Sequence, residues 1–360
     1  MLKFESLRNP FFLILILFTA SFAFGQTTKY SNEFMNIGVD ARAFGMANAV
    51  VAHTDDVNSG YWNPAGLIHL EDKQIALMHA AYFANIAQYD YVGFAMPIDH
   101  YSALGVSFIR FGVDDIMNTT QLIDSQGNID YDRISLFSAA DYGVVFSYTR
   151  KPVTNDYLSY GGNAKVIRRV IGDFASSWGF GFDLALQYQR DDWSFGVMLR
   201  DITTTYNTWQ IDEDIFDGVS DQIPEQEIPE TTEVTLPKAQ IGVSRKFVFN
   251  FDYTLLAEVD LNMRFAETND IFSSESVSMT PAVGFEFGYR DMVFVRAGAG
   301  NFQNELQLDG SENMSFQPNI GAGFRYKSIQ VDYALTDIGD QSAAIYSNVF
   351  SVRVDWKLFR

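Results

Sequence analysis

The chain has 360 residues and a formal net charge of −20, which would repel phosphate backbones, so nucleic acid is excluded as a partner. The absence of cysteine excludes thiol catalysis, thiolate metal sites, disulfides and a lipid-modified cysteine. Only 19% of the residues are charged, below the roughly 25% of an ordinary soluble domain, while 15% are aromatic, a bias that favours pleated strands.

Residues 1–25 have the composition of an export signal. Lys3 and Arg8 give a weakly basic start, residues 11–18 form an apolar core, and small residues precede a cleavage site at Gln26. The apolar core is too short to span a membrane comfortably. We therefore expect a cleaved signal peptide, and no later apolar run is long enough for a transmembrane helix.

Residues 26–72 show no strict alternation of polar and apolar positions. Residues 36–50 are rich in small side chains, and residues 63–67 have turn chemistry. The segment is too apolar to be a solvated tail. We predict that it forms an N-terminal hatch, or plug, inside the structure that follows.

From residue 73 onward the sequence alternates with a period of two. In residues 251–265 the odd positions are apolar and the even ones mostly polar, and residues 176–190 and 350–358 repeat the pattern. Successive side chains of a strand point to opposite faces, so each segment separates an apolar from a polar environment. At ~3.3 Å per residue the longest segment would span roughly 50 Å, more than a soluble sandwich needs.

The connections between these segments alternate in length. Short turns such as 190–191 and 290–291 contrast with longer connections at 112–138 and 204–233, as in outer-membrane barrels. Such a sheet must close, because an open edge in hydrocarbon leaves unpaired backbone groups. Fourteen alternating segments are found, at about 73–83, 88–97, 101–111, 139–150, 157–170, 176–190, 192–203, 234–247, 250–266, 277–290, 292–303, 314–326, 328–337 and 346–359.

The predicted fold is therefore an all-β, antiparallel transmembrane barrel of about fourteen strands over residues 73–360. Its predicted place is the outer membrane of a Gram-negative cell, with both termini in the periplasm. A soluble sandwich with large aromatic residues is the alternative, which export, strand length and loop asymmetry all disfavour.

Charged residues on the polar faces are expected to point into the lumen. They could line a path for a charged substrate, but pairing with one another or with water is the simpler interpretation. Glycines on the same face, such as Gly298 and Gly321, would leave room for the hatch or allow curvature. The predicted lumen charges are Arg110, Asp183, Arg200, Glu258, Asp260, Arg264, Glu286, Arg296, Arg325, Asp332, Arg353 and Asp355.

The sequence offers no candidate catalytic, cofactor-binding or metal-binding residue. No two of its four histidines have the i, i+4 spacing of a helical zinc site, and neither a Gly-x-Ser-x-Gly motif nor a phosphate loop occurs. His53 beside Asp55 and Asp56 is better explained as a turn of the plug than as acid–base machinery. We therefore expect a protein that is not an enzyme.

Two predicted loops are candidates for binding a partner. The acidic segment 210–233 could bind hard cations or a basic partner, or could bridge lipopolysaccharide through divalent ions as a mobile surface loop. The loop 112–138 is more apolar and is a candidate docking surface. The candidate residues are Met117, Leu122 and Ile123 in the second loop, and Asp212, Glu213, Asp214 and Asp217 in the first.

The stretch NIGVDARAFGMANAVVAHTDDVNSGYWNPAGL, residues 36–67, resembles the N-terminal signature of the PorV/PorQ family, which is itself similar to the FadL-like outer-membrane transporters. The match lies in an Asp-Ala-Arg-Ala turn, a run of small residues, an Asp-Asp pair and then Trp-Asn-Pro-Ala-Gly-Leu. The chain departs from the usual barrel ending by placing Arg360 after Phe359. The signature residues are Asp40, Arg42, Asp55, Asp56, Trp62, Asn63, Pro64 and Gly66.

This resemblance implies a fourteen-stranded barrel with an N-terminal hatch and leaves two functions open. PorV-like members act in type IX secretion, binding the C-terminal signal domain of exported cargo and escorting it to the attachment machinery. FadL-like relatives take up fatty acids and other hydrophobic molecules through the hatch and a lateral gap in the wall. The expected partners are thus outer-membrane lipid and lipopolysaccharide, with either secreted proteins and secretion-system components or a hydrophobic small molecule.

Overall fold

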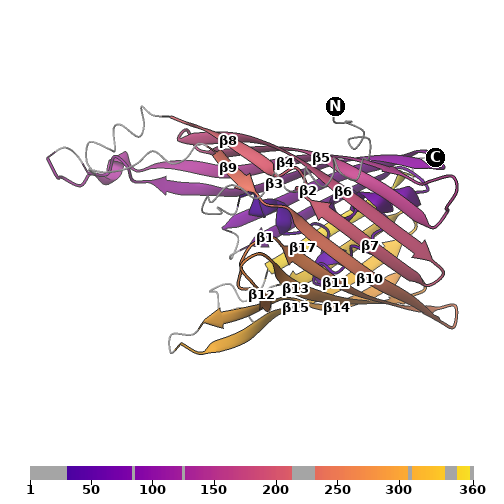
Figure 1. Cartoon of the computed structure of the whole chain (residues 1–360). Helices are drawn as coiled ribbons and strands as arrows, with labels where there is room; N and C mark the ends of the chain where they lie inside the picture. The colour runs from indigo at the N-terminus through magenta and orange to yellow at the C-terminus, as the bar shows by residue number, and fades with distance from the viewer. Residues whose placement is uncertain are drawn as a thin grey trace, which may run out of the picture.

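The computed structural model describes residues 31–82, 86–123, 126–212, 232–306, 310–336 and 347–356. Their strands form one antiparallel sheet that closes into a barrel where β17 (Ser347–Asp355) pairs with β1 (Gln74–Tyr82) (Figure 1). The predicted fold class, a closed antiparallel β-barrel of about fourteen strands, is confirmed. No helix in the described part of the chain has the length and apolar character to cross a membrane.

The strand segments are more numerous than the positions around the ring. β7 and β8 both pair with β6 and together fill one position, β9 and β10 fill the next, and β12 is a two-residue addition to β13. Between β1 and β17 the strands are β2 (Ala87–Asp99), β3 (Ser102–Asn118), β4 (Ser135–Arg150), β5 (Leu158–Ile171), β6 (Ala175–Arg190), β7 (Trp193–Arg200), β8 (Thr205–Ile211), β9 (Thr232–Thr235), β10 (Lys238–Phe249), β11 (Tyr253–Arg264), β12 (Phe272–Ser273), β13 (Ser278–Tyr289), β14 (Val293–Leu306), β15 (Glu312–Tyr326) and β16 (Ile329–Thr336).

The wall is interrupted at one end of the barrel. Asp201 and Thr204, between β7 and β8, have left-handed φ angles of 54° and 61°, and Pro237, between β9 and β10, has no N–H to continue a ladder. Among the described residues β9 pairs only with β8 and β12 only with β13, so no ladder joins β9 to β12. In Figure 1, β9 and β12 lie apart at this end of the barrel.

The alternation of side chains follows the sequence. On β6 the even-numbered Trp178, Phe180 and Phe182 are exposed on the outer face, whereas the odd-numbered Ser177 and Asp183 are buried inside the ring. An apolar outer face and a polar lumen are what an outer-membrane barrel requires.

One predicted lumen charge is misplaced. Arg110 has the same parity on β3 as Leu104 and Phe108, which are exposed outward, while the neighbouring Ile109 is fully buried inside. The prediction for Arg110 was wrong because it followed the charge of the side chain instead of its position in the alternation. Most of the other predicted lumen charges, among them Glu258 and Arg296, are buried inside the ring.

The two long predicted loops are shorter than expected. β3 continues to Asn118 and β4 starts at Ser135, so much of 112–138 is a two-stranded ribbon. Likewise β8 and β9 occupy both ends of 204–233. The predicted signal peptide lies outside the described residues.

Candidate functional site

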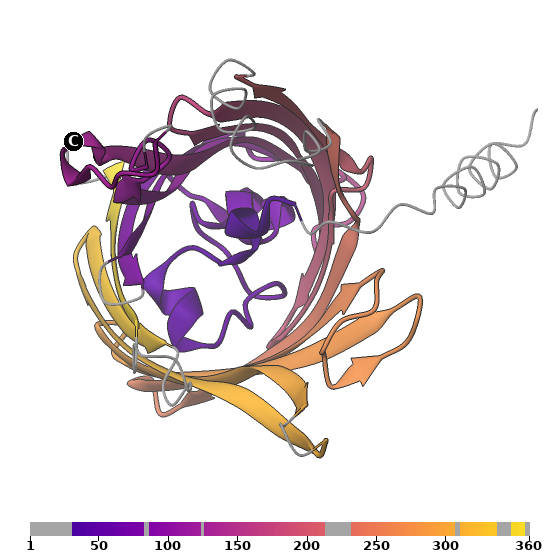
Figure 2. The ribbon, with the colours of Figure 1, turned by 90° about the vertical axis from the view of Figure 1, so that its left-hand side faces the viewer.

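A segment of short helices lies inside the ring, and we call residues 31–72 the lumen segment (Figure 2). Many of its small residues, such as Ala41, Ala49 and Ala65, are fully buried, so the segment is closely packed. Its helical elements are η2 (Glu33–Asn36), α2 (Ala41–Gly45), α3 (Ser59–Trp62) and η3 (Pro64–His69), and a further short helix, η4 (Tyr131–Arg133), lies outside it.

Asp40 fixes the start of α2. Its φ of 76° is left-handed, and its carboxylate accepts hydrogen bonds from the Arg42 backbone N–H at 3.2 Å and from the Ser351 hydroxyl of β17 at 2.7 Å. The same Ser351 hydroxyl accepts from the Ala41 N–H at 3.1 Å. The helix cap is therefore also an attachment to the barrel wall.

Arg42 begins a chain of charges that runs along the lumen face of neighbouring strands. Its guanidinium donates to both carboxylate oxygens of Glu286 on β13, at 2.9 and 3.1 Å. Glu286 also accepts from Arg296 at 2.6 Å, and Arg296 donates to Asp332 at 2.7 Å. Arg296 is fully buried, so it depends on these two carboxylates to offset its desolvation.

The charge chain returns to the lumen segment through β16 and β17. Gln330 donates to Asp332 at 2.8 Å and accepts from Arg353 at 2.7 Å, and Arg353 forms an ion pair with Asp56. Arg42 also lies 3.6 Å from Asp55. We use the name charge chain for Arg42, Glu286, Arg296, Asp332, Gln330, Arg353 and Asp56; because it begins and ends on the lumen segment, it ties that segment to four strands of the wall.

Two carboxylates of β11 hold the loop that follows α2. One oxygen of Asp260 accepts from the backbone N–H groups of Val50 and Val51 at 2.9 and 3.1 Å, and Glu258 accepts from Ala52 at 2.6 Å. Both carboxylates are 1% exposed. These carboxyl groups supply acceptors to three backbone N–H groups that would otherwise be buried without a partner.

The opposite half of the wall holds the turn at residues 63–67. The Asn63 amide donates to the carbonyl of Val51 at 2.9 Å and to that of Leu186 on β6 at 3.1 Å, and its oxygen caps η3 by accepting from Ala65. Gln187 of β6 donates to the carbonyls of Ala52 and Thr54, each at 2.9 Å. The lumen segment is thus attached on both sides of the ring.

Close packing explains two glycines. A Cβ on Gly66 would lie 2.2 Å from the Thr54 carbonyl oxygen, and a Cβ on Gly298 of β14 would lie 2.4 Å from the Met46 carbonyl carbon. Neither separation is sterically possible. Glycine in the wall therefore makes room for the lumen segment, as one of the two sequence interpretations proposed.

Aromatic side chains of α3 join parts of the lumen segment and contact β7. The Trp62 indole donates to the Val39 carbonyl at 2.9 Å, and the Tyr61 hydroxyl donates to that of Met35 at 2.7 Å. The guanidinium of Arg200 on β7 lies 4.7 Å from the Tyr61 ring centroid and 6.0 Å from that of Trp62. These contacts place a lumen cation against aromatic faces.

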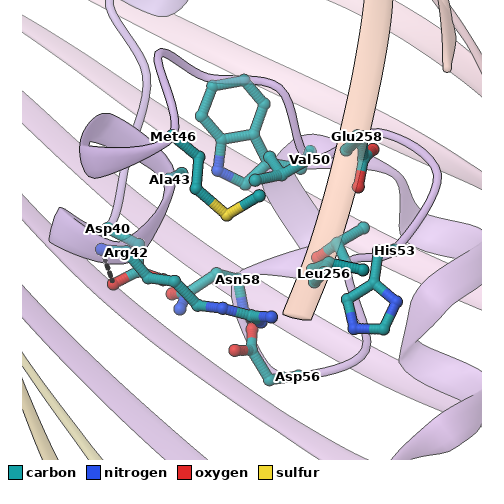
Figure 3. Close-up of a pocket in the computed structure, with 12 residues that line it drawn as sticks. Asp40, Arg42, Ala43, Met46, Val50, His53, Asp56, Asn58, Leu256 and Glu258 are labelled. Carbon is teal, nitrogen blue, oxygen red and sulfur yellow. Dashed lines mark hydrogen bonds between the residues drawn. The ribbon is translucent and has the colours of Figure 1, made fainter. Parts of the chain in front are cut away.

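A small cavity remains between α2 and β11 (Figure 3). Its volume of about 10 Å³ suits about one water molecule. Asp40, His53 and Glu258 line it together with the signature residues Arg42 and Asp56. This cavity is too small for a substrate molecule.

Burial controls the titration of the lumen segment. Burial raises the pKa of the Asp40 carboxyl to about 6, and the carboxylates of Asp332 and Asp56 add to the rise. Burial lowers the pKa of the His53 imidazole. For Arg42, burial disfavours the charged form, but Glu286 and Asp55 outweigh it and hold the pKa well above its usual range.

The arrangement is suited to holding a segment in place. Within the described ranges no three His, Cys, Asp or Glu side chains cluster in a way that could hold a metal ion. His53, Asp55 and Asp56 sit beside the charge chain, where Arg42 and Arg353 occupy the carboxylates.

The signature residues are brought together, whereas the candidate loop residues are not. Met117 lies in β3, Leu122 and Ile123 lie beyond its end, and Asp212 follows β8. Ile123 forms an isolated bridge with Ile129 across the tip of the ribbon. Glu213, Asp214 and Asp217 lie outside the described residues.

The sequence did not reveal which wall residues contact the lumen segment and its signature residues. Glu286, Arg296 and Asp332 stood among the predicted lumen charges, but nothing in the sequence joined them to Arg42. Gln187 and Gln330 were not singled out at all, since neither carries a charge. Their lumen-facing parity on β6 and β16 was the one available signal.

The sequence model of the family described as type IX secretion system protein PorV matches residues 25–217. No curated protein matches the sequence.

Solved structures share the fold at low sequence identity. They include a Pseudomonas aeruginosa FadL homologue, with a TM-score of 0.52 and 12% identity over 88% of this chain and 98% of that one. They also include the Pseudomonas putida toluene transporter TodX, with a TM-score of 0.55 and 10% identity over 91% and 98%. The Ralstonia pickettii toluene transporter TbuX has a TM-score of 0.53 and 12% identity over 88% and 98%. At such identities the likeness concerns the fold alone, and none of these proteins is described as an enzyme.

Proposed function

This chain belongs to the PorV family of type IX secretion proteins, and from that premise we propose that it is an outer-membrane barrel that binds and escorts exported proteins at its outer end. The observation that carries the proposal is a projecting apolar ribbon above a lumen that is filled and tied shut. The hatch role of the lumen segment, and the anchoring roles of its signature residues, are part of the same proposal.

The ribbon is the end of the β3–β4 hairpin. Beyond Val113 and Ala139 neither β2 nor β5 accompanies it, because their ladders end at those residues. A tilted strand needs about 9–11 residues to cross the hydrocarbon, and β3 has 17. The ribbon therefore extends past the membrane.

Apolar side chains are exposed on this ribbon. Met117 and Leu136 lie directly opposite each other and are 69% and 60% exposed, and Tyr131 near the tip is 71% exposed. A two-stranded ribbon is marginally stable by itself, and exposed apolar surface outside lipid marks a site for a protein partner.

The orientation follows from the connections. Gln74, at the start of β1, pairs with Asp355, at the end of β17, on the side of the short turns. Short turns face the periplasm in barrels of this kind. This supports the placement of both termini in the periplasm and of the ribbon at the cell surface, where the acidic residues around Asp212 would bridge lipopolysaccharide through divalent cations.

The test is capture of a purified C-terminal signal domain from an exported protein by the detergent-solubilised barrel. The double variant Met117→Ser and Leu136→Ser should weaken capture at least tenfold. Val153→Ser is the matched control, since Val153 is an equally exposed apolar residue, at 70%, in a short turn at the other end. Equal capture by all three proteins would refute the ribbon as the docking surface.

A second function has an observation in its favour. The interrupted wall near Asp201 could admit a hydrophobic molecule from the side, and Tyr82, Tyr89 and Phe111 form an edge-to-face aromatic series in the lumen with centroids 6.4 and 6.1 Å apart. Two of the similar structures are described as toluene transporters. A hydrophobic molecule that copurifies inside the barrel, together with unchanged capture of the signal domain, would favour FadL-like transport.

A further inference from the structure

The outer surface of the barrel carries one polar row among apolar ones. Cross-strand pairing joins its members in register from β1 to β6, and each shares the outward parity of exposed neighbours such as Phe108 and Phe180. We call this the girdle row: His79, Asp90, Arg110, Tyr142, Arg168 and Trp178.

The girdle row marks the edge of the hydrocarbon. Two residues nearer the short turns, the paired outward positions are all apolar: Leu77, Val92, Phe108, Val144, Val166 and Phe180. Arginine is destabilising at the membrane midplane but tolerated near the interface. On the other side of the row, β3 and β4 continue into the projecting ribbon, so the row lies at the outer leaflet.

Arg168 lacks an acidic partner there. Its guanidinium stacks at 5.0 Å from the Trp178 ring centroid and donates to the Ser177 carbonyl at 3.4 Å. No carboxylate of the described chain lies within salt-bridge distance of it. A cation facing the headgroup layer with only these partners calls for an external anion.

Arg110 is close to Arg168 and makes only long contacts with carboxylates. Tyr142 lies between them in the row, so their backbones are separated by two strand spacings, roughly 10 Å. Arg110 lies 3.6 Å from Asp90 and 3.5 Å from Asp114, at the limit of useful contact. Both long side chains can therefore turn toward one anion between them.

We propose that Arg110 and Arg168 form a binding site for a phosphate group of a glycolipid headgroup in the outer leaflet, with Tyr142 as its floor. Two guanidinium groups suit the several oxygens of a phosphate. The apolar row below, with Phe108 and Phe180 exposed by 40% and 59%, offers a surface for the acyl chains of the same lipid. The site uses the membrane orientation given above and is independent of the protein partner.

The test measures lipid binding by the full-length barrel in detergent, with native mass spectrometry as the readout. The probes are bis-phosphorylated lipid A, lipid A stripped of phosphate, and inorganic phosphate as a competitor. Arg168→Gln should weaken lipid A binding about tenfold, and the double variant with Arg110→Gln should weaken it further. Arg245→Gln is the matched control, since Arg245 also stacks 5.0 Å from a tryptophan, Trp193, but at the short-turn end.

Each outcome decides the matter. Weaker binding of lipid A by the girdle variants, with no loss in Arg245→Gln and little binding of stripped lipid, supports the site. Equal binding by all variants overturns it. Equal loss with stripped lipid shows packing on Trp178 instead of phosphate recognition, and full displacement by millimolar inorganic phosphate shows an anion site that needs no lipid.

Discussion

Removing the Arg42 guanidinium should release the lumen segment from the wall. The variant Arg42→Met keeps most of the side-chain stem and deletes the two hydrogen bonds to Glu286. Arg42 and Glu286 are 13% and 11% exposed, so the pair is largely buried. Breaking a buried pair by removing one partner is destabilising by about 3–5 kcal/mol, or roughly two to four orders of magnitude in the equilibrium between docked and released states.

Cysteine labelling can measure this equilibrium, because the chain has no native cysteine. Ala43 is 2% exposed, lies next to Arg42 in α2 and borders the small cavity, so Ala43→Cys places a thiol where it reacts only after release. The rate of maleimide labelling in detergent should rise at least a hundredfold when Arg42→Met is added.

Two further variants make the reasoning refutable. Asp55→Asn removes the other partner of Arg42, which lies 3.6 Å away and is 46% exposed, so it should change the rate less than about fivefold. Glu286→Gln weakens the same contact from the wall side and should also raise the labelling rate, because it leaves Arg42 with only the longer contact to Asp55. If Arg42→Met labels no faster than Asp55→Asn, the charge chain does not hold the lumen segment.

Three other perturbations test the remaining attachments. Gly66→Ala should lower stability by about 1–3 kcal/mol, because its Cβ would meet the Thr54 carbonyl oxygen at 2.2 Å, and the melting temperature in detergent reports this. Asn63→Ala should cost about 2–3 kcal/mol in denaturant unfolding, because it leaves the carbonyls of Val51 and Leu186 without that donor. Since the pKa of Asp40 is raised to about 6, the folded state binds its proton more tightly than the unfolded state, so its contribution to stability is present at pH 4 and lost as the pH rises through about 6. Asp40→Asn should therefore gain stability relative to the native chain as the pH rises from about 4 to 7, by about 1–3 kcal/mol. The lowered pKa values of His53 and His69 act in the opposite sense but are common to both proteins. Melting temperatures of the two proteins that change in parallel with pH would contradict the assignment.

The barrel could be predicted because lipid imposes a pattern on every strand. A wall with hydrocarbon outside and a polar lumen requires apolar and polar side chains to alternate along every strand. This pattern can be read within a single strand, as in β6 and β11. The interruptions at Asp201–Thr204 and at Pro237 were not predicted, because a break of a few residues leaves the alternation on either side unchanged. The projecting ribbon was taken for a loop, since beyond the membrane its two faces no longer differ in polarity.

The contacts of the lumen segment could not be predicted in the same way. Arg42 and Glu286 are 244 residues apart, and several other lumen acids are equally acceptable partners on charge alone. The choice depends on the register of α2 against β13, which follows from packing such as that of Met46 against Gly284 and Gly298. For Arg110 the sequence did hold the answer, because Arg110 is two residues after the apolar Phe108 on the same strand and therefore faces outward. Its charge alone suggested the lumen.

The shape of the charge chain bears on which function the barrel can perform. Because the chain leaves the lumen segment at Arg42 and returns at Asp56, moving that segment as a unit would break the ion pairs at both ends together. The loop at Val50–Ala52 would lose its carboxylates in the same motion. Losses of this size sum to more than a weakly bound hydrophobic molecule can supply, since a ligand shifts an equilibrium only by its difference in affinity for the two states. Passage through the lumen is therefore disfavoured, and any transport would have to use the interrupted wall, whereas binding of an exported protein at the outer end requires no such motion.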